Sequence, residues 1–190
     1  IAIPIIIQNG ITNFVNLLDN IMVGQIGTEQ MSGVAIINQL MFVFNICIFG
    51  GISGAGIFSA QFYGNRDHKG VRHAFRFKLI ICALITLLAL GIFTFFDTQL
   101  ISLYLHEGSS NLDASITLYY AEEYLKIMLL GLVPFALSQA YSSTLREMGI
   151  TKVPMVSGII AVLINLVLNY VLIYGKLGAP ALGVVGAAIA

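Results

Sequence analysis

One carboxylate lies in a long, otherwise uncharged stretch near the N-terminus, and it is the residue best suited to chemistry. Asp19 is the one acidic residue well inside a segment apolar enough to cross a membrane. A charged carboxylate there costs roughly 2.5–3.5 kcal/mol, a cost that falls when the group takes a proton or binds a cation. Asp19 is therefore a candidate carrier of H⁺ or ligand of a hard monovalent cation. The alternative is an Asp that is hydrogen-bonded for structure alone.

Further polar residues accompany Asp19 in the same segment. They are Gln8, Asn9, Thr12, Asn13, Asn16 and Asn20. On a helix, at about 100° per residue, these side chains and that of Asp19 fall within an arc of roughly 140°. The rest of the segment is mostly Ile, Val, Leu, Phe and Met. A helix of this kind places its polar face against a polar cavity.

Two asparagines near the C-terminus could complete an ion site. Asn165 and Asn169 are four residues apart, so on a helix their amides project from one face. Amide oxygens suit a hard cation, although an asparagine pair in a membrane helix also serves as a contact between helices. Ser138 and Ser142 share a face at the same spacing, and their hydroxyls can equally bond to helical carbonyls.

Composition and motifs exclude most other functions. The 190 residues are 58% hydrophobic and 9% charged, whereas soluble domains carry about 25% charged residues. Nine Lys and Arg balance nine Asp and Glu, which does not suggest a nucleic-acid partner. Cys47 and Cys82 lie in apolar runs without metal-ligand spacing. No Ser/His/Asp group, HExxH, P-loop or GxGxxG stands in a plausible context. We expect an integral membrane protein that is not an enzyme and has no cofactor beyond a coupling ion.

Long apolar runs predict the elements that position these side chains. A membrane helix needs about 20 mostly apolar residues, and five segments qualify: residues 3–24, 34–63, 71–96, 119–145 and 154–174. A sixth begins near Leu182. The runs lack the alternation of barrel strands, so we expect an all-α, polytopic helical bundle. Because the sixth run has just begun where the sequence ends, we also expect that residues 1–190 are a piece of a longer protein.

Basic residues gather in alternate loops of the predicted bundle. The loops after the second and fourth segments hold Arg66, Lys69, Arg72, Arg76, Lys78, Arg146 and Lys152. The opposite side holds Lys126 and Lys176 among Glu29, Asp97, Glu107, Asp113, Glu122 and Glu123. Since Lys and Arg are enriched in cytoplasmic loops, the pattern predicts a cytoplasmic N-terminus.

Five motifs mark the ends of these segments. They are Asp19-Asn-Ile-Met-Val-Gly-Gln-Ile-Gly27, Ala60-Gln-Phe-Tyr-Gly-Asn-Arg-Asp67, Arg146-Glu-Met-Gly-Ile-Thr-Lys-Val-Pro154, Asn165-x-x-x-Asn169-Tyr-x-Leu-Ile-x-Gly175 and Gly178-Ala-Pro-Ala-Leu-Gly-Val-Val-Gly-Ala-Ala188. In this order and spacing, the chain resembles the multidrug and toxic compound extrusion (MATE) transporters over essentially its whole length.

The resemblance implies a fold and a function. Family members have twelve helices in two six-helix lobes flanking a cavity, so residues 1–190 would be most of the first lobe. Members are antiporters that export organic, often cationic, drugs against inflowing Na⁺ or H⁺. The resemblance assigns the coupling ion to Asp19, Asn165 and Asn169, with Na⁺ as the only metal. Pro4 matches a proline near which helix bending has been proposed to couple protonation to drug release. We expect the substrate cavity to be lined by Gln8, Thr12, Asn16, Asn20, Ser138 and Ser142.

One departure and two alternatives accompany this interpretation. Some members have a second carboxylate at the position of Asn169, so a relay that uses protons alone is less well supported here. A related flippase for lipid-linked oligosaccharides would need cationic residues in mid-membrane to meet a pyrophosphate, and the predicted spans have none. A membrane-embedded enzyme would need catalytic groups in the missing half. We expect a bacterial, monomeric protein of the cytoplasmic membrane whose partners are drugs, bilayer lipids and a C-terminal lobe.

Overall fold

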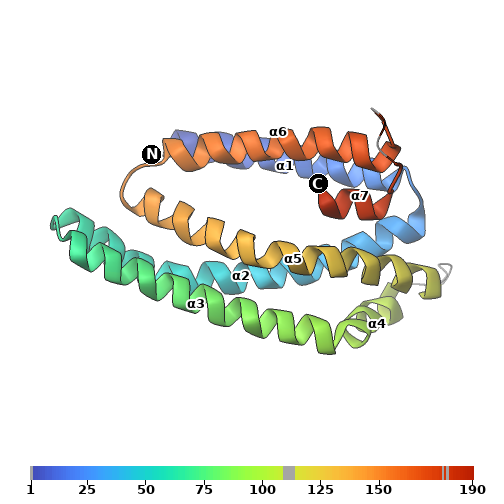
Figure 1. Cartoon of the computed structure of the whole chain (residues 1–190), viewed down its shortest axis with the longest axis horizontal. Coiled ribbons are helices and arrows are strands. Elements are labelled where there is room, and N and C mark those ends of the chain that lie inside the picture. The colour runs from blue at the N-terminus through green and yellow to red at the C-terminus, as the bar shows by residue number, and fades with distance from the viewer. Residues whose placement is uncertain (1, 109–113, 177, 179) are drawn as a thin grey trace.

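The described part of the chain is all-helical, as the apolar runs predict. A computed structural model describes residues 2–108, 114–176, 178 and 180–190. Its helices are α1 (Ala2–Gly24), α2 (Thr28–Gly64), α3 (His68–Phe95), α4 (Asp97–Gly108), α5 (Ala114–Glu147), α6 (Lys152–Tyr174) and α7 (Val184–Ile189) (Figure 1). Four of them, α2, α3, α5 and α6, are long and apolar enough to cross a membrane. The remaining predicted span, α1, is as long as α6, with 23 residues. It is not apolar enough to count as a membrane span, because its polar stripe lowers its mean hydropathy.

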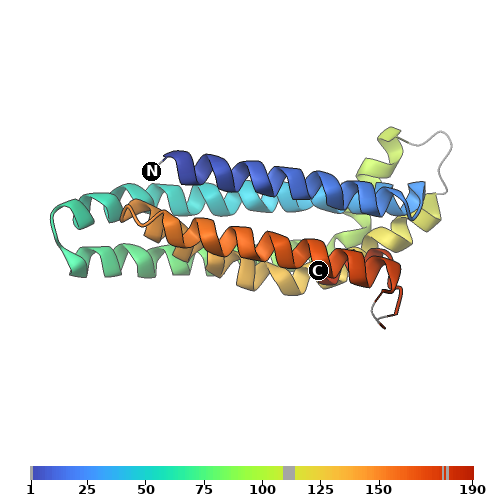
Figure 2. The ribbon, with the colours of Figure 1, turned by 90° about the horizontal axis from the view of Figure 1, so that it is seen from above.

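Two features of the helices differ from the prediction. The apolar runs predict no element between residues 96 and 119, yet α4 forms there and buries Ile101 completely. At 12 residues, α4 is shorter than the roughly 20 apolar residues that predict a membrane helix. It lies beside the end of the bundle (Figure 2). The helices α2 and α5 also begin several residues earlier than predicted, at Thr28 and Ala114, because a helix continues into the polar residues beyond its apolar run.

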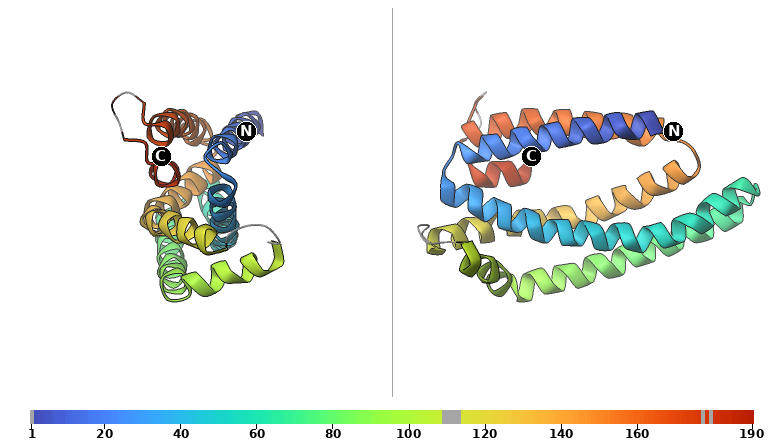
Figure 3. Two further views of the ribbon diagram at one scale, coloured as in Figure 1. Left: turned by 90° about the vertical axis from the view of Figure 1, so that its right-hand side faces the viewer. Right: turned by 180° about the vertical axis from the view of Figure 1, so that it is seen from behind.

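The helices form two groups. One group contains α2, α3 and α5, and the other contains α1 and α6, which lie side by side and run in the same direction (Figures 1 and 3). The short helix α7 packs against both α5 and α6 and so joins the groups. The helix α1, with its polar stripe, therefore packs mainly against α6 and also contacts α2.

Close approach of α2 to α5 depends on one glycine. A Cβ atom at Gly33 would lie 3.0 Å from the Ala121 backbone nitrogen and 3.0 Å from the Thr117 carbonyl oxygen. Small residues let membrane helices pack backbone against backbone. Around this contact, the core is apolar and includes the fully buried Ile37 and Ala121.

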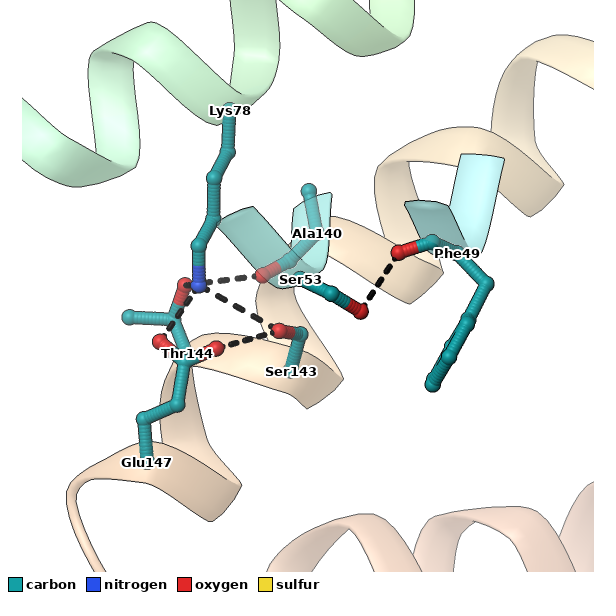
Figure 4. Close-up of polar contacts among 7 residues, drawn as sticks. All are labelled: Phe49, Ser53, Lys78, Ala140, Ser143, Thr144 and Glu147. Atoms are coloured by element: carbon teal, nitrogen blue, oxygen red, sulfur yellow. Dashed lines mark hydrogen bonds and ion pairs between the residues drawn. The ribbon is translucent and has the colours of Figure 1, made fainter. Parts of the chain in front are cut away.

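A buried polar cluster joins α3 to α5 (Figure 4). The Lys78 side chain is fully buried and donates from Nζ to Ser143 Oγ at 3.2 Å and to Thr144 Oγ1 at 3.3 Å. It also forms an ion pair with the Glu147 carboxylate, which accepts a second hydrogen bond from Ser143 Oγ at 2.6 Å. The prediction that Lys78 belongs to a loop is wrong, because α3 begins at His68 and contains Lys69, Arg72, Arg76 and Lys78. Arg146 and Lys152 likewise lie in α5 and α6 rather than in the connection between them.

The other basic residues near these connections gather at one end of the molecule. The α2–α3 and α5–α6 connections lie together at that end, whereas the α1–α2 and α6–α7 connections lie at the other (Figure 1). Arg66, Lys69, Arg72 and Arg76 therefore share an end with Arg146 and Lys152. Which end faces the cytoplasm stays a prediction.

Candidate functional site

Asp19 and the two asparagines meet at the junction of α1 and α6. Asn169 Nδ2 donates a hydrogen bond of 2.7 Å to Asp19 Oδ1 and lies 3.4 Å from Asn165 Oδ1. The parallel course of the two helices explains this contact, because it brings the C-terminal halves of α1 and α6 to the same level. The spacing of Asn165 and Asn169 then turns both amides toward Asp19.

These residues open into a cavity of about 440 Å³. Residues of α1, α2, α5, α6 and α7 line it, and five of them carry side-chain amides: Asn16, Asn20, Asn38, Asn165 and Asn169. Of the described residues that line the cavity, Asp19 is the one that carries a charge. The polar stripe of α1 therefore faces a polar cavity at Asn16, Asp19 and Asn20, as the sequence predicts.

The oxygen atoms around Asp19 fit a small hard cation. Asn169 is 2% exposed, and its Oδ1 is buried without a hydrogen-bond partner in the described part of the structure. A buried polar atom without a partner costs about 1–3 kcal/mol, a cost that a bound cation or proton donor would remove. Carboxylate and amide oxygens are the ligands that hard cations prefer. Among the described residues there is no cluster of three or more His, Cys, Asp or Glu side chains.

Comparison with known sequences identifies the family. The sequence model of the MatE family matches residues 4–171. The chain belongs to the MatE (MATE) family. It is 30% identical over 190 residues to a probable multidrug resistance protein NorM from Thermotoga maritima. This match covers the whole of the present chain and 39% of that relative. The chain thus spans about two fifths of the length of the curated relative that it matches.

Solved MATE-type structures share its fold. One is the outward-facing conformation of a multidrug resistance MATE family transporter of the MOP superfamily, with a TM-score of 0.78 and 26% identity. Another is a MOP superfamily transporter from Pyrococcus furiosus, for which "reverse polarity of binding pocket suggests different function", with a TM-score of 0.75 and 27% identity. Each match covers 98% of this chain and 39% of the other. Because these proteins are transporters, the alternative of a membrane-embedded enzyme is not supported.

Four of the predicted cavity residues of this MATE chain lie away from the cavity at Asp19. Gln8 Oε1 accepts a hydrogen bond of 3.3 Å from Arg146 Nη2, roughly 16 Å along α1 from Asp19. Thr12, Ser138 and Ser142 are not among the residues that line the 440 Å³ cavity either. Their contact with substrate stays a prediction for the larger space between two lobes. Pro4 lies within α1, which continues without a break to Gly24, and its role in bending also stays a prediction.

Two polar residues that line the cavity were not predicted from the sequence. Asn38 comes from α2, and Tyr124, which is 7% exposed, comes from α5. The sequence could have indicated Asn38 as a candidate site residue, because it is an amide inside an apolar run. The sequence gives no such indication for Tyr124, because a tyrosine near the end of a membrane span is an ordinary interfacial residue.

Proposed function

We propose that this chain is the first lobe of a MATE multidrug efflux antiporter, which exports organic, often cationic, compounds against inflowing Na⁺ or H⁺. The observation that supports the proposal is the placement of Asp19, hydrogen-bonded to Asn169, in a polar cavity that brings together five helices. Reversible binding of a cation or proton fits one carboxylate among amides better than bond breaking does. The relatives named as multidrug resistance proteins support export as the direction of transport.

In the proposed mechanism, the ion acts on the contact between α1 and α6. The ionised Asp19 carboxylate is a strong acceptor for the Asn169 amide. A proton on Asp19 would weaken this acceptor, and Na⁺ would draw the oxygens of Asp19, Asn165 and Asn169 toward itself. Either event changes how the polar stripe of α1 packs against α6. A drug held by that stripe would then lose contacts, so ion and drug compete.

A second lobe would complete the transport cycle. Because the chain spans 39% of the matched relatives, we place the remaining helices in a C-terminal lobe across the cavity. Rocking of two helical units about a site between them gives alternating access. We propose a monomer in the cytoplasmic membrane with the basic end of the bundle, at Arg66 and Arg146, in the cytoplasm, in agreement with the enrichment of Lys and Arg on that side.

The test uses the full-length protein in lipid vesicles. Efflux of a fluorescent cationic dye is followed after a Na⁺ gradient or a H⁺ gradient is imposed, for wild type and for Asp19→Asn. We expect one of the two gradients to drive efflux and Asp19→Asn to abolish it. Asp97→Asn is the matched control, since it makes the same change at the start of α4, outside the cavity.

Two results would contradict the proposal. If Asp19→Asn left coupled efflux intact, the ion site would lie elsewhere. If neither gradient moved dye in vesicles with folded protein, a flippase for lipid-linked substrates would become the better interpretation. The Pyrococcus furiosus neighbour, with its different pocket polarity, keeps that alternative relevant, although the charge in the present cavity is that of Asp19.

A further inference from the structure

One face of α3 combines basic and apolar residues in sequence along the helix. Lys69, Arg72 and Arg76 lie near its first residue, and Leu79, Ala83, Leu87 and Leu90 follow. At about 100° per residue, these side chains fall within an arc of roughly 80°. The basic residues are exposed and form no ion pair with any described residue. The nearby Asp67 carboxylate instead caps α3 by accepting from the backbone nitrogens of Lys69 and Gly70.

The apolar half of this face is one wall of a groove between α3 and α5. The groove has a volume of about 260 Å³, and its opposite wall includes Val133 and Leu137 of α5. From Leu79 to Leu90 it extends roughly 16 Å along α3. Ala83, Leu87, Val133 and Leu137 are exposed, so the groove opens to the outside of the bundle. It is separate from the cavity at Asp19, with which it shares no lining residue.

An aromatic pair lies at the basic end of the groove, next to Arg76 in α3. The rings of Phe75 on α3 and Tyr141 on α5 have centroids 4.9 Å apart. Tyr141 is one helical turn beyond Leu137 and is 56% exposed. Tyrosine is typical of the boundary between hydrocarbon and headgroups. The basic residues and the aromatic pair therefore lie together at one end, and the apolar groove follows, which matches the headgroup and interfacial region of a phospholipid followed by its acyl chain.

We propose that this face binds an anionic phospholipid of the bilayer. One acyl chain occupies the groove between α3 and α5, and the phosphate-bearing headgroup contacts Arg72 and Arg76. Two observations favour a lipid over a second lobe as the occupant. The helix α3 lies at the edge of the bundle opposite α1 and α6, away from the proposed interlobe cavity (Figures 1 and 3). The site also combines an apolar groove with unpaired positive charge on the same helix face, which matches the two parts of an anionic lipid.

The lipid site does not depend on the transport proposal, so its test needs no transport. Full-length protein is reconstituted in phosphatidylcholine vesicles doped with phosphatidylglycerol that carries a photoactivatable group in its acyl chain. After illumination, adducts are mapped by mass spectrometry. We expect adducts in residues 79–90 and 133–141, and fewer adducts from a phosphatidylcholine probe with the same acyl chain. Each arginine lost should weaken binding about fivefold, the effect of one basic residue at an anionic surface.

Two pairs of variants separate the headgroup contact from the groove. Arg76→Gln removes a charge above the groove, and Lys152→Gln removes one at the same end of the molecule, at the start of α6. Ala83→Phe fills the groove, and Leu88→Phe enlarges an exposed residue on another face of α3. We expect Arg76→Gln and Ala83→Phe to reduce phosphatidylglycerol adducts in the groove and the two controls to leave them unchanged.

The proposal is overturned by any of three results. Equal labelling by phosphatidylglycerol and phosphatidylcholine would mean that Arg72 and Arg76 do not select an anionic headgroup. Adducts spread evenly over the exposed faces would mean that the groove binds no particular chain. An unlabelled groove would mean that protein, such as a second lobe, covers it. If Ala83→Phe fails to fold, the comparison of Arg76→Gln with Lys152→Gln still decides.

Discussion

Asn169 donates a hydrogen bond of 2.7 Å to Asp19 although 150 positions separate the two residues in the chain. The contact holds α1 against α6 at the level of the cavity, so the proposed ion site is also a joint between two helices. In the transport proposal, this contact is what links ion binding to the packing of α1 against α6. A ligand that changes the charge on Asp19 must change the packing of α1 at the same point.

The first prediction concerns Asn169. Asn169→Leu keeps the size of the side chain but removes both the donor to Asp19 and the buried Oδ1. We expect ion-driven dye efflux by the full-length protein to fall at least about tenfold, the equivalent of roughly 1.4 kcal/mol, because Asp19 loses its hydrogen bond. Asn9→Leu is the control, since Asn9 belongs to the same stripe but does not line the cavity. Equal efflux rates for Asn169→Leu and wild type would refute the role given to Asn169.

The second prediction concerns Asn38, which the structure adds to the site. Asn38→Leu removes one amide from the cavity wall, whereas Gln39→Leu makes a similar change at an exposed neighbour outside it. We expect Asn38→Leu to lower the efflux rate severalfold and Gln39→Leu to leave it unchanged, with both proteins inserted in equal amounts. Vesicle efflux normalised to protein content measures the difference. A larger effect at Gln39 would show that the cavity is not the transport site.

The third prediction concerns the ion pair between Lys78 and Glu147. Glu147→Gln leaves the fully buried Lys78 ammonium without its counter-charge, and removal of one partner of a buried pair costs about 3–5 kcal/mol. The double variant Lys78→Met, Glu147→Gln should recover most of that loss, because no buried charge remains. Thermal unfolding of the purified full-length variants measures both. A double variant less stable than the single one would show that Lys78 stabilises the bundle through its bonds to Ser143 and Thr144 even without Glu147.

The fourth prediction concerns the close contact at Gly33. Gly33→Ala places a Cβ atom 3.0 Å from two backbone atoms of α5, and overpacking of this kind costs about 1–3 kcal/mol. Gly54→Ala, also in α2, has nothing within 4 Å of the new atom and should be neutral or stabilising by up to about 1 kcal/mol. The unfolding temperatures of the two variants should therefore shift in opposite directions or by clearly different amounts. Equal shifts would mean that α2 and α5 separate without cost.

The sequence predicts the helices and half of the site because those features depend on local patterns. The apolar runs predict the long helices, and the 100° periodicity predicts that Asn16, Asp19 and Asn20 share a face. The spacing of Asn165 and Asn169 predicts that both amides share a helix face, and the motif resemblance assigns them to the ion site. Tyr124 could not be found in this way, since it reaches the cavity only because α5 packs beside α2. Lys78 was misplaced for a related reason: a cation near the start of an apolar run looks like a loop residue until its partner, Glu147, is brought to it by tertiary packing.

The dependence of α1 on α6 has a consequence for biosynthesis. Among the long helices that the structure describes, α1 is the one whose polar stripe keeps it below the hydropathy of a membrane span, and its main neighbour α6 follows it only after α2, α3, α4 and α5. At about 5–20 residues per second, the ribosome delivers Asn169 roughly 8–30 s after Asp19. During that interval, Asp19 lacks the hydrogen bond from Asn169, and we expect the insertion of α1 to remain reversible. We expect nascent chains that stop before α6 to be the forms from which quality-control proteases extract α1.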